Sequence, residues 1–327
     1  MKRLRVVFFG MGGDFMLRPL LRIALSHDVV GLVLARGKAT KLARLMSCVR
    51  HILLRLQLRL RLYFLGKGNM PILEFDKSKQ HEIIGALHAL CPDLFCVAGF
   101  PCLLKPEVFS IAPLGCINMH PSLLPAYRGP SPYFWIYYNH EPRTGVTIHR
   151  IDAGEDSGDI LAQESVEVPL GLPGAAMLST IRDLGAHLME QVVNDVANNQ
   201  VRVKANPHNS PTCRARRPDS KVEYVDWQNW PVRRVFHFLK GVMPNWYTPP
   251  ALKGLGIGKK YYLSAFVESN HVERPLVLVK ESGEYKVFCL DGWLVFKPVT
   301  IRMQLERLLR KVIKLFGKMN VKTDLKR

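Results

Sequence analysis

An amide and an imidazole stand two residues apart in the segment Asn118-Met119-His120. If residues 115–120 form a β-strand, side chains i and i+2 point to the same face, so Asn118 and His120 project together at its carboxyl end. An asparagine N–H can donate to an oxygen that becomes negative during acyl transfer. A histidine can accept or relay a proton from an attacking amine near neutral pH. The pair predicts an acyl-transfer site, although Asn-x-His on its own is more often structural.

A carboxylate that would orient the histidine is available in the glycine-containing loop 152–159, which follows another expected strand. Asp152, Glu155, Asp156 and Asp159 are the candidates within this loop. A plain turn is the alternative interpretation, and the spacing does not fit the D-x-[DN]-x-[DN]-G pattern of a calcium loop. The combination of this loop with Asn118 and His120 is more specific than either part alone.

These segments, in this order, resemble the signature of the formyltetrahydrofolate-dependent formyltransferases. The resemblance is strong over about residues 85–165 and extends in layout over 1–200. It is carried by three motifs: Asn118-x-His120-Pro-Ser-Leu-Leu-Pro125-x-x-Arg128-Gly129, Gly145-Val-Thr-x-His149, and Asp152-x-Gly-x-Asp156-Ser157-Gly158-Asp159.

The resemblance implies an enzyme that uses 10-formyltetrahydrofolate as co-substrate and requires no metal. It assigns Asn118, His120 and Asp156 to catalysis, with Asn118 polarising the formyl oxygen. The segment 97–104 resembles the loop whose backbone binds the pterin ring. The implied donor-binding residues are Phe100, Pro101, Cys102, Leu103, Leu104 and Asp152.

Arg128 and Gly12 are candidates for binding the formyl acceptor. Arg128 could bind an acceptor phosphate or carboxylate, or it could brace its own loop. The segment Gly10-x-Gly12-Gly13 lacks the spacing of a dinucleotide-binding loop, so it is either a structural turn or a source of backbone N–H groups for a phosphate. His149 comes just before a loop and could face either the pocket or the core.

The elements that must position these residues predict an α/β, Rossmann-like domain with a mostly parallel sheet. A buried strand at 4–9, a glycine turn, a helix at 15–26 and a strand at 29–34 form a βαβ opening. The continuation is a helix at 78–90, strands at 93–98 and 115–119, a helical segment near 132–140, a strand at 144–151 and a helix at 173–198.

A second, small and mostly β domain is expected after a polar, proline-containing linker at 206–221. We therefore divide the chain into a catalytic domain at 1–205 and a C-terminal domain at 206–327. The second domain should hold a short helix and then a small barrel or sandwich, with a basic amphipathic helix at the end. These elements are expected at 229–241, 259–267, 275–280, 284–289, 292–297 and 300–318.

The charge of the chain is strongly basic, with a formal net charge of +19 over 327 residues. Residues 29–73 contain no Asp or Glu, and the tail 299–327 holds nine Lys and Arg. The Leu/Arg-rich segment 44–65 and this tail have three interpretations: they bind tRNA phosphates, they rest on an anionic membrane, or they are solvated faces. No apolar stretch approaches the ~20 residues of a membrane span. Seven scattered cysteines without a C-x-x-C pair indicate reduced thiols in a cytoplasmic protein.

The formyl acceptor, a primary amine, stays open at this point. Methionyl-tRNA is favoured by the basic charge and by residues 223–227, 244–246 and 283–296, which resemble the C-terminal domain of the tRNA-acting branch. An amino-sugar nucleotide or other small amine is favoured by the segment 97–100 and by Pro121, where that branch usually has glycine. Hydrolysis of the donor, or a non-catalytic role in binding RNA or a membrane, are the remaining alternatives. Neither the oligomeric state nor the role of segment 44–65 follows from the sequence.

Overall fold

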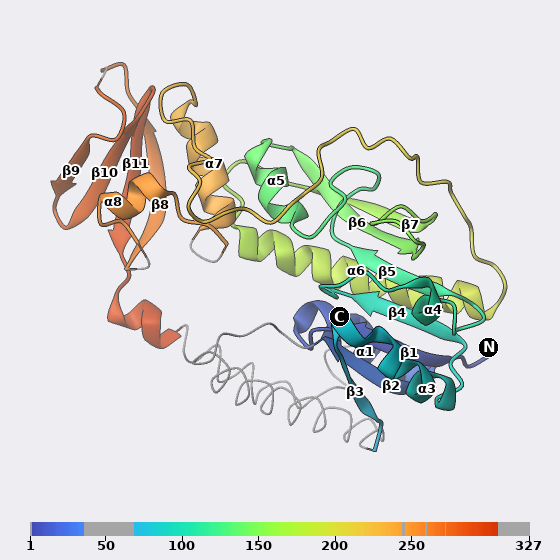
Figure 1. The fold of residues 1–327 in the computed structure, drawn as a ribbon. Coiled ribbons are helices and arrows are strands. Elements are labelled where there is room, and N and C mark those ends of the chain that lie inside the picture. The colour runs from blue at the N-terminus through green and yellow to red at the C-terminus, as the bar shows by residue number, and fades with distance from the viewer. Residues whose placement is uncertain (1, 36–68, 244–245, 259, 272, 307–327) are drawn as a thin grey trace.

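The computed structural model describes residues 2–35, 69–243, 246–258, 260–271 and 273–306. Its larger part is a seven-stranded sheet with the strand order β3-β2-β1-β4-β5-β6-β7, shown in Figure 1. The first five strands of this order run parallel, β6 runs antiparallel to β5, and β7 runs antiparallel to β6. The bounds are β1 Arg5–Gly10, β2 Asp28–Ala35, β3 Ile72–Phe75, β4 Leu94–Ala98, β5 Cys116–His120, β6 Arg143–Arg150 and β7 Ile160–Glu167.

Helices cover both faces of this sheet, because the central strands are mostly apolar and bury side chains on each side. Val6 and Phe8 of β1 belong to the core that includes α1 and α6, whereas Val7 and Phe9 pack toward η1, α3 and α4. The helix bounds are α1 Asp14–Ser26, η1 Lys77–Ile83, α3 Ile84–Ala89, α4 Pro106–Phe109, α5 Pro132–Tyr138 and α6 Gly174–Ala197.

The expected α/β fold with a mostly parallel sheet is confirmed, with local corrections. The single helix expected at 78–90 is wrong in its first half, which is a 3₁₀ turn with non-helical dihedrals at Lys79. Strands β3 and β7 were not expected. β7 carries polar residues on its outer half and lies at an edge of the sheet, so it lacks the apolar run of the central strands.

The C-terminal part contains α7 Val232–Val242, α8 Pro250–Gly254 and the strands β8 Tyr261–Glu268, β9 Leu278–Glu281, β10 Glu284–Cys289 and β11 Gly292–Pro298. Within the described residues these strands form one open antiparallel sheet in the order β8-β11-β10-β9, so the expected barrel or sandwich is wrong. Helix α7 packs against β8 on one side and α5 on the other. Tyr133 of α5 stacks on Trp246, which joins the two parts.

Two expectations fall outside the described residues. One is the Leu/Arg-rich segment 44–65. The other is the part of the expected helix at 300–318 that follows residue 306, whereas residues 301–306 are described and are helical. Among the residues that the structure describes, no helix is both long and apolar enough to cross a bilayer.

Candidate active site

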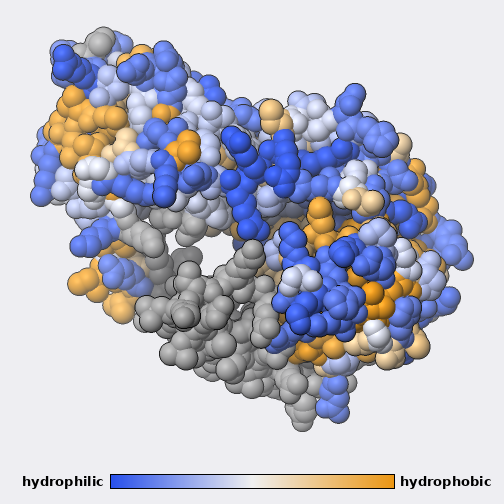
Figure 2. All heavy atoms as spheres, in the orientation of Figure 1, coloured by the Kyte–Doolittle hydropathy of each residue, from blue (hydrophilic) through white to orange (hydrophobic). Residues whose placement is uncertain are grey.

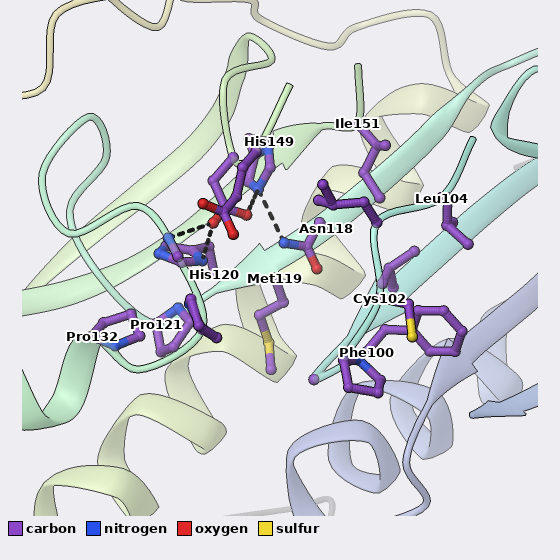
Figure 3. A pocket seen from close by; sticks show the side chains of 18 of the residues that line it. Phe100, Cys102, Leu104, Asn118, Met119, His120, Pro121, Pro132, His149 and Ile151 are labelled. Carbon is purple, nitrogen blue, oxygen red and sulfur yellow. Dashed lines mark hydrogen bonds and ion pairs between the residues drawn. The ribbon is translucent and has the colours of Figure 1, made fainter. Parts of the chain in front are cut away.

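The predicted catalytic residues lie in a cavity of about 380 Å³ at the carboxyl ends of β4 and β5, shown in Figure 3. Phe15, which follows the turn after β1, completes one wall. Ligands of open α/β sheets bind at this edge, where successive connections leave the sheet on opposite faces. The volume falls in the range of small-molecule sites.

Asn118 and His149 are paired across the antiparallel strands β5 and β6, where their Cα atoms are direct partners. His149 Nδ1 donates to the Arg150 carbonyl at 2.7 Å, since a carbonyl oxygen can only accept. Nε2 of the neutral ring therefore carries a lone pair, and it accepts from Asn118 Nδ2 at 3.0 Å. This contact fixes which end of the Asn118 amide faces His149 and leaves its second N–H for a ligand.

His120 and Asp156 form the second contact of the cluster, with His120 Nδ1 3.4 Å from Asp156 Oδ2. The other nitrogen of the ring, Nε2, donates to the Tyr127 carbonyl at 3.0 Å. Burial lowers the pKa of His120, and the nearby Asp156 carboxylate opposes this shift. The free enzyme therefore holds a neutral imidazole beside a carboxylate that would stabilise the charged form once a proton arrives.

Asp156 is kept ionised by its surroundings. Burial would raise its pKa, but positive charge on His120 or His149, together with the Gly129 N–H, holds the pKa well below its usual range. Gly129 N donates to Asp156 Oδ2 at 2.9 Å, and Asp156 Oδ1 lies 3.5 Å from His149 Nε2. The carboxylate thus lies between the two histidines, within 3.4 Å of His120 Nδ1 and 3.5 Å of His149 Nε2.

The implied donor-binding residues all line the same cavity. They are Phe100, Pro101, Cys102, Leu103, Leu104 and Asp152. The Phe100 ring packs edge-on against Phe9 at 5.7 Å and Phe75 at 4.9 Å, which holds the apolar wall in place. A largely apolar slot bounded by the backbone of two loops fits a flat heterocycle with a polar edge, as a pterin is.

The two residues expected to bind the acceptor do not line this cavity. Arg128 donates instead to the Asn206 side chain at 3.0 Å and to the carbonyls of Pro207 and His208 at 2.7 and 2.9 Å. The backbone N–H of Gly12 is directed at Met16 Sδ, 3.2 Å away, so this N–H does not face a phosphate. Both residues brace loops in this structure.

Sequence reasoning left the role of His149 open and did not include Phe15, Tyr133, Ile151 or Glu155, which also line the cavity. His149 could have been found from the register of β5 and β6, but that antiparallel register cannot be read from one sequence. Phe15, Tyr133 and Ile151 are ordinary apolar residues whose position depends on how three loops meet.

Comparisons with known proteins agree with this geometry. The family model described as formyl transferase matches residues 36–193. The chain is 30% identical to a methionyl-tRNA formyltransferase of Acetivibrio thermocellus over 237 residues, which is 72% of this chain and 75% of that protein. It is 26% identical to a methionyl-tRNA formyltransferase of Clostridium novyi over 305 residues, covering 90% of this chain and 92% of that protein.

Solved structures show the same fold. A sugar 3N-formyltransferase crystallised with dTDP and 5-N-formyl-THF aligns with a TM-score of 0.59 at 13% identity, covering 91% of this chain and 98% of that one. An N-formyltransferase from Helicobacter canadensis aligns with a TM-score of 0.58 at 13% identity, covering 90% of this chain and 99% of that one. From the family match and these relatives, the chain belongs to the formyltransferase family, is similar to the methionyl-tRNA formyltransferases, and is an enzyme that transfers a formyl group from a folate-type donor.

Proposed function

We propose that this enzyme transfers the formyl group of 10-formyltetrahydrofolate to the amino group of methionyl-tRNA. The observation that carries the acceptor is the extent of similarity to the methionyl-tRNA formyltransferases. It includes the C-terminal part and reaches 92% of the Clostridium novyi protein. The formal net charge of +19 also favours a polyanionic acceptor.

The proposed mechanism uses the two contacts of the cluster. Asn118 donates an N–H to the formyl oxygen as the amine attacks and negative charge develops there. His120 accepts the proton that the amine loses, and Asp156 stabilises the resulting imidazolium. As the new C–N bond forms, the bond from the formyl carbon to the donor nitrogen breaks, and His120 returns the proton to that nitrogen.

The walls of the cavity support a division between donor and acceptor. The apolar slot at Phe100 and Leu104 would hold the pterin, with Asp152 on the opposite loop. The side lined by Pro132, Tyr133 and Leu178 is left for the acceptor. Asn118 and His120 lie between the two sides, where the formyl carbon must meet the amine.

An amino-sugar nucleotide is the second candidate acceptor. The segment 97–100 favours it, because it resembles the small-substrate members of the family, and Pro121 favours it because the tRNA-acting members usually have glycine there. Both segments line the cavity, so they are placed to affect which acceptor is used.

Release of tetrahydrofolate from 10-formyltetrahydrofolate tests the proposal. It should be measured with methionyl-tRNA, with a dTDP-amino sugar, and with no acceptor, using N-acetylmethionyl-tRNA as the control that lacks a free amine. Release stimulated only by methionyl-tRNA, and lost in His120→Ala, is the expected result. Stimulation only by the amino sugar would replace the acceptor, and equal release without any acceptor would indicate a hydrolase.

A further inference from the structure

The segment between α6 and α7, expected from its composition to be a linker, is hydrogen-bonded to both loops that form the active site. In Figure 1 it crosses in front of α5, and Figure 2 shows mainly hydrophilic residues there. Thr212 Oγ1 accepts from Tyr127 N at 2.7 Å, and Ala215 exchanges backbone hydrogen bonds with Arg128 and Ser131. The Arg214 guanidinium pairs with Glu155, the neighbour of Asp156. We call residues 204–216 the strap.

Asn206 is the buried polar residue of this strap, with 7% of its surface exposed. Its Nδ2 donates to the carbonyl oxygens of Asp156 at 3.0 Å and Gly158 at 3.1 Å. Its Oδ1 accepts from Arg128 at 3.0 Å. The orientation of the amide is unambiguous, because carbonyl oxygens only accept and a guanidinium only donates.

These contacts close a ring of hydrogen bonds around Asp156. Arg128 holds Asn206, Asn206 holds the backbone of Asp156, and Gly129 holds the Asp156 carboxylate at 2.9 Å. Because Arg128 and Gly129 are adjacent in the chain, one loop fixes both the backbone and the side chain of the same aspartate. A shift of this loop would move the carboxylate relative to both histidines.

Asp156 needs such support, because its φ of +52° lies in the left-handed region. That conformation is unfavourable for a non-glycine residue and persists where the surroundings enforce it. The two bonds from Asn206 act on the carbonyl of Asp156 and on that of Gly158, two residues later. Gly158 packs so closely on the Arg150 carbonyl that an added Cβ would clash with it. The backbone of this loop is therefore held from two sides.

We propose that Asn206 is a positioning residue of the transfer reaction, which sets the distance of the Asp156 carboxylate from His120 and His149. This inference deepens the proposed function, since it assigns the strap to the same site. Arg128 holds Asn206 and so helps to position Asp156. This role of Arg128 differs from the acceptor binding that the sequence predicts.

The test is the titration of the His120 imidazole, followed by NMR in the full chain, together with kcat and the donor KM. His120 is faced by Asp156, His149, Glu155 and the Tyr127 carbonyl, and the Asp156 carboxylate raises its pKa. In Asn206→Ala the Asp156 carbonyl loses its hydrogen bond, so the carboxylate should move away from His120 and the His120 titration should move toward acid. The kcat should fall about 10- to 100-fold with little change in the donor KM.

Two further variants keep the inference falsifiable. Arg128→Lys retains the cation but not the forked contacts, so an intermediate shift and an intermediate kcat are expected even if Asn206→Ala does not fold. His208→Ala is the matched control, because only the backbone of His208 takes part in the strap contacts and its side chain is exposed.

The outcomes separate this inference from the proposed function. An unchanged His120 titration in both folded variants would overturn the positioning role, whatever the activity. A wild type that forms no product with any acceptor would contradict the proposed function, while the NMR titration would still decide the role of Asn206. A fall in kcat with no shift in titration would mean that Asn206 only stabilises the fold.

Discussion

Asn118 and His149 are direct cross-strand partners, with Asn118 Nδ2 3.0 Å from His149 Nε2 at the carboxyl end of β5. Side chains opposite each other on one face of an antiparallel pair lie close enough to interact. The histidine thereby orients the amide that is proposed to polarise the formyl oxygen. The contact thus joins Asn118, which the sequence already assigns to the site, to His149, whose role the sequence leaves open.

Replacing His149 should separate its hydrogen bond from its bulk. His149→Phe removes the acceptor for Asn118 and should lower kcat about 10-fold, because a misoriented amide loses its alignment with the formyl oxygen. His149→Gln places a carbonyl oxygen near the position of Nε2 and should retain more activity. Steady-state kinetics at saturating donor would measure both, and equal kcat values for Phe and wild type would contradict the role.

Asn118→Asp keeps the shape of the side chain but removes both N–H groups. Loss of one oxyanion donor typically costs about 10²- to 10³-fold in kcat, and we expect a fall of that size with a small change in donor KM. Asn199→Asp is a suitable control, because Asn199 is exposed. The φ of Asn199 is positive, and both asparagine and aspartate tolerate that conformation. A large change in donor KM with normal kcat would instead assign Asn118 to donor binding.

The titration of His120 depends on Asp156 in a direction that can be stated in advance. Burial lowers the pKa of His120 below its ordinary value, and the Asp156 carboxylate raises it. Asp156→Asn removes the raising contribution, so the His120 titration should move further toward acid. NMR of the imidazole in the two proteins would measure this, and a move toward alkaline pH would contradict the arrangement.

His237 should make the fold sensitive to acid. It is fully buried in α7, accepts from Gly171 N at 3.0 Å, and has a pKa lowered to about 4 by burial and by His140, whose ring is 4.7 Å away. In the unfolded chain this histidine titrates near pH 6.5, so as pH falls the unfolded state binds a proton before the folded state does. The free energy of unfolding is therefore unaffected by this group above about pH 6.5 and decreases as pH falls toward 4.

The corresponding experiment compares unfolding free energies at pH 7 and pH 5. His237 should contribute a loss of about 2 kcal/mol over this interval, an order-of-magnitude figure. His237→Asn keeps an acceptor for Gly171 but does not titrate, so its loss should be smaller by about that amount. If the unfolding free energies of wild type and His237→Asn changed equally between pH 7 and pH 5, His237 would not be the group responsible.

Phe100 should affect binding of the donor rather than the chemistry. Phe100→Ala removes apolar wall from the pterin slot and should raise the donor KM about 10-fold, in line with ~1.4 kcal/mol of lost contact. Phe236→Ala is the control, since Phe236 packs on Phe266 in the C-terminal part and does not line the cavity. An unchanged donor KM in Phe100→Ala would place the pterin elsewhere.

The sequence by itself determined the central strands, because their apolar runs require burial on both faces of a sheet. It determined the α/β class, because a strand, a glycine turn, a helix and a second strand follow one another at the start of the chain. It also determined that Asn118 and His120 share one face, since a strand has a period of two. The candidate carboxylate Asp156 followed from a motif, and the structure brings it to 3.4 Å from His120.

Only the tertiary structure decided which residues from distant segments meet around these three. The register of β5 against β6 brings His149 to Asn118, and the strap brings Asn206 to Asp156 across 50 residues of chain. Such contacts depend on loop paths and antiparallel pairing, which carry no local periodicity. A polar, proline-containing segment therefore appears from its composition as a linker, although its hydrogen bonds attach it to the loops that form the active site.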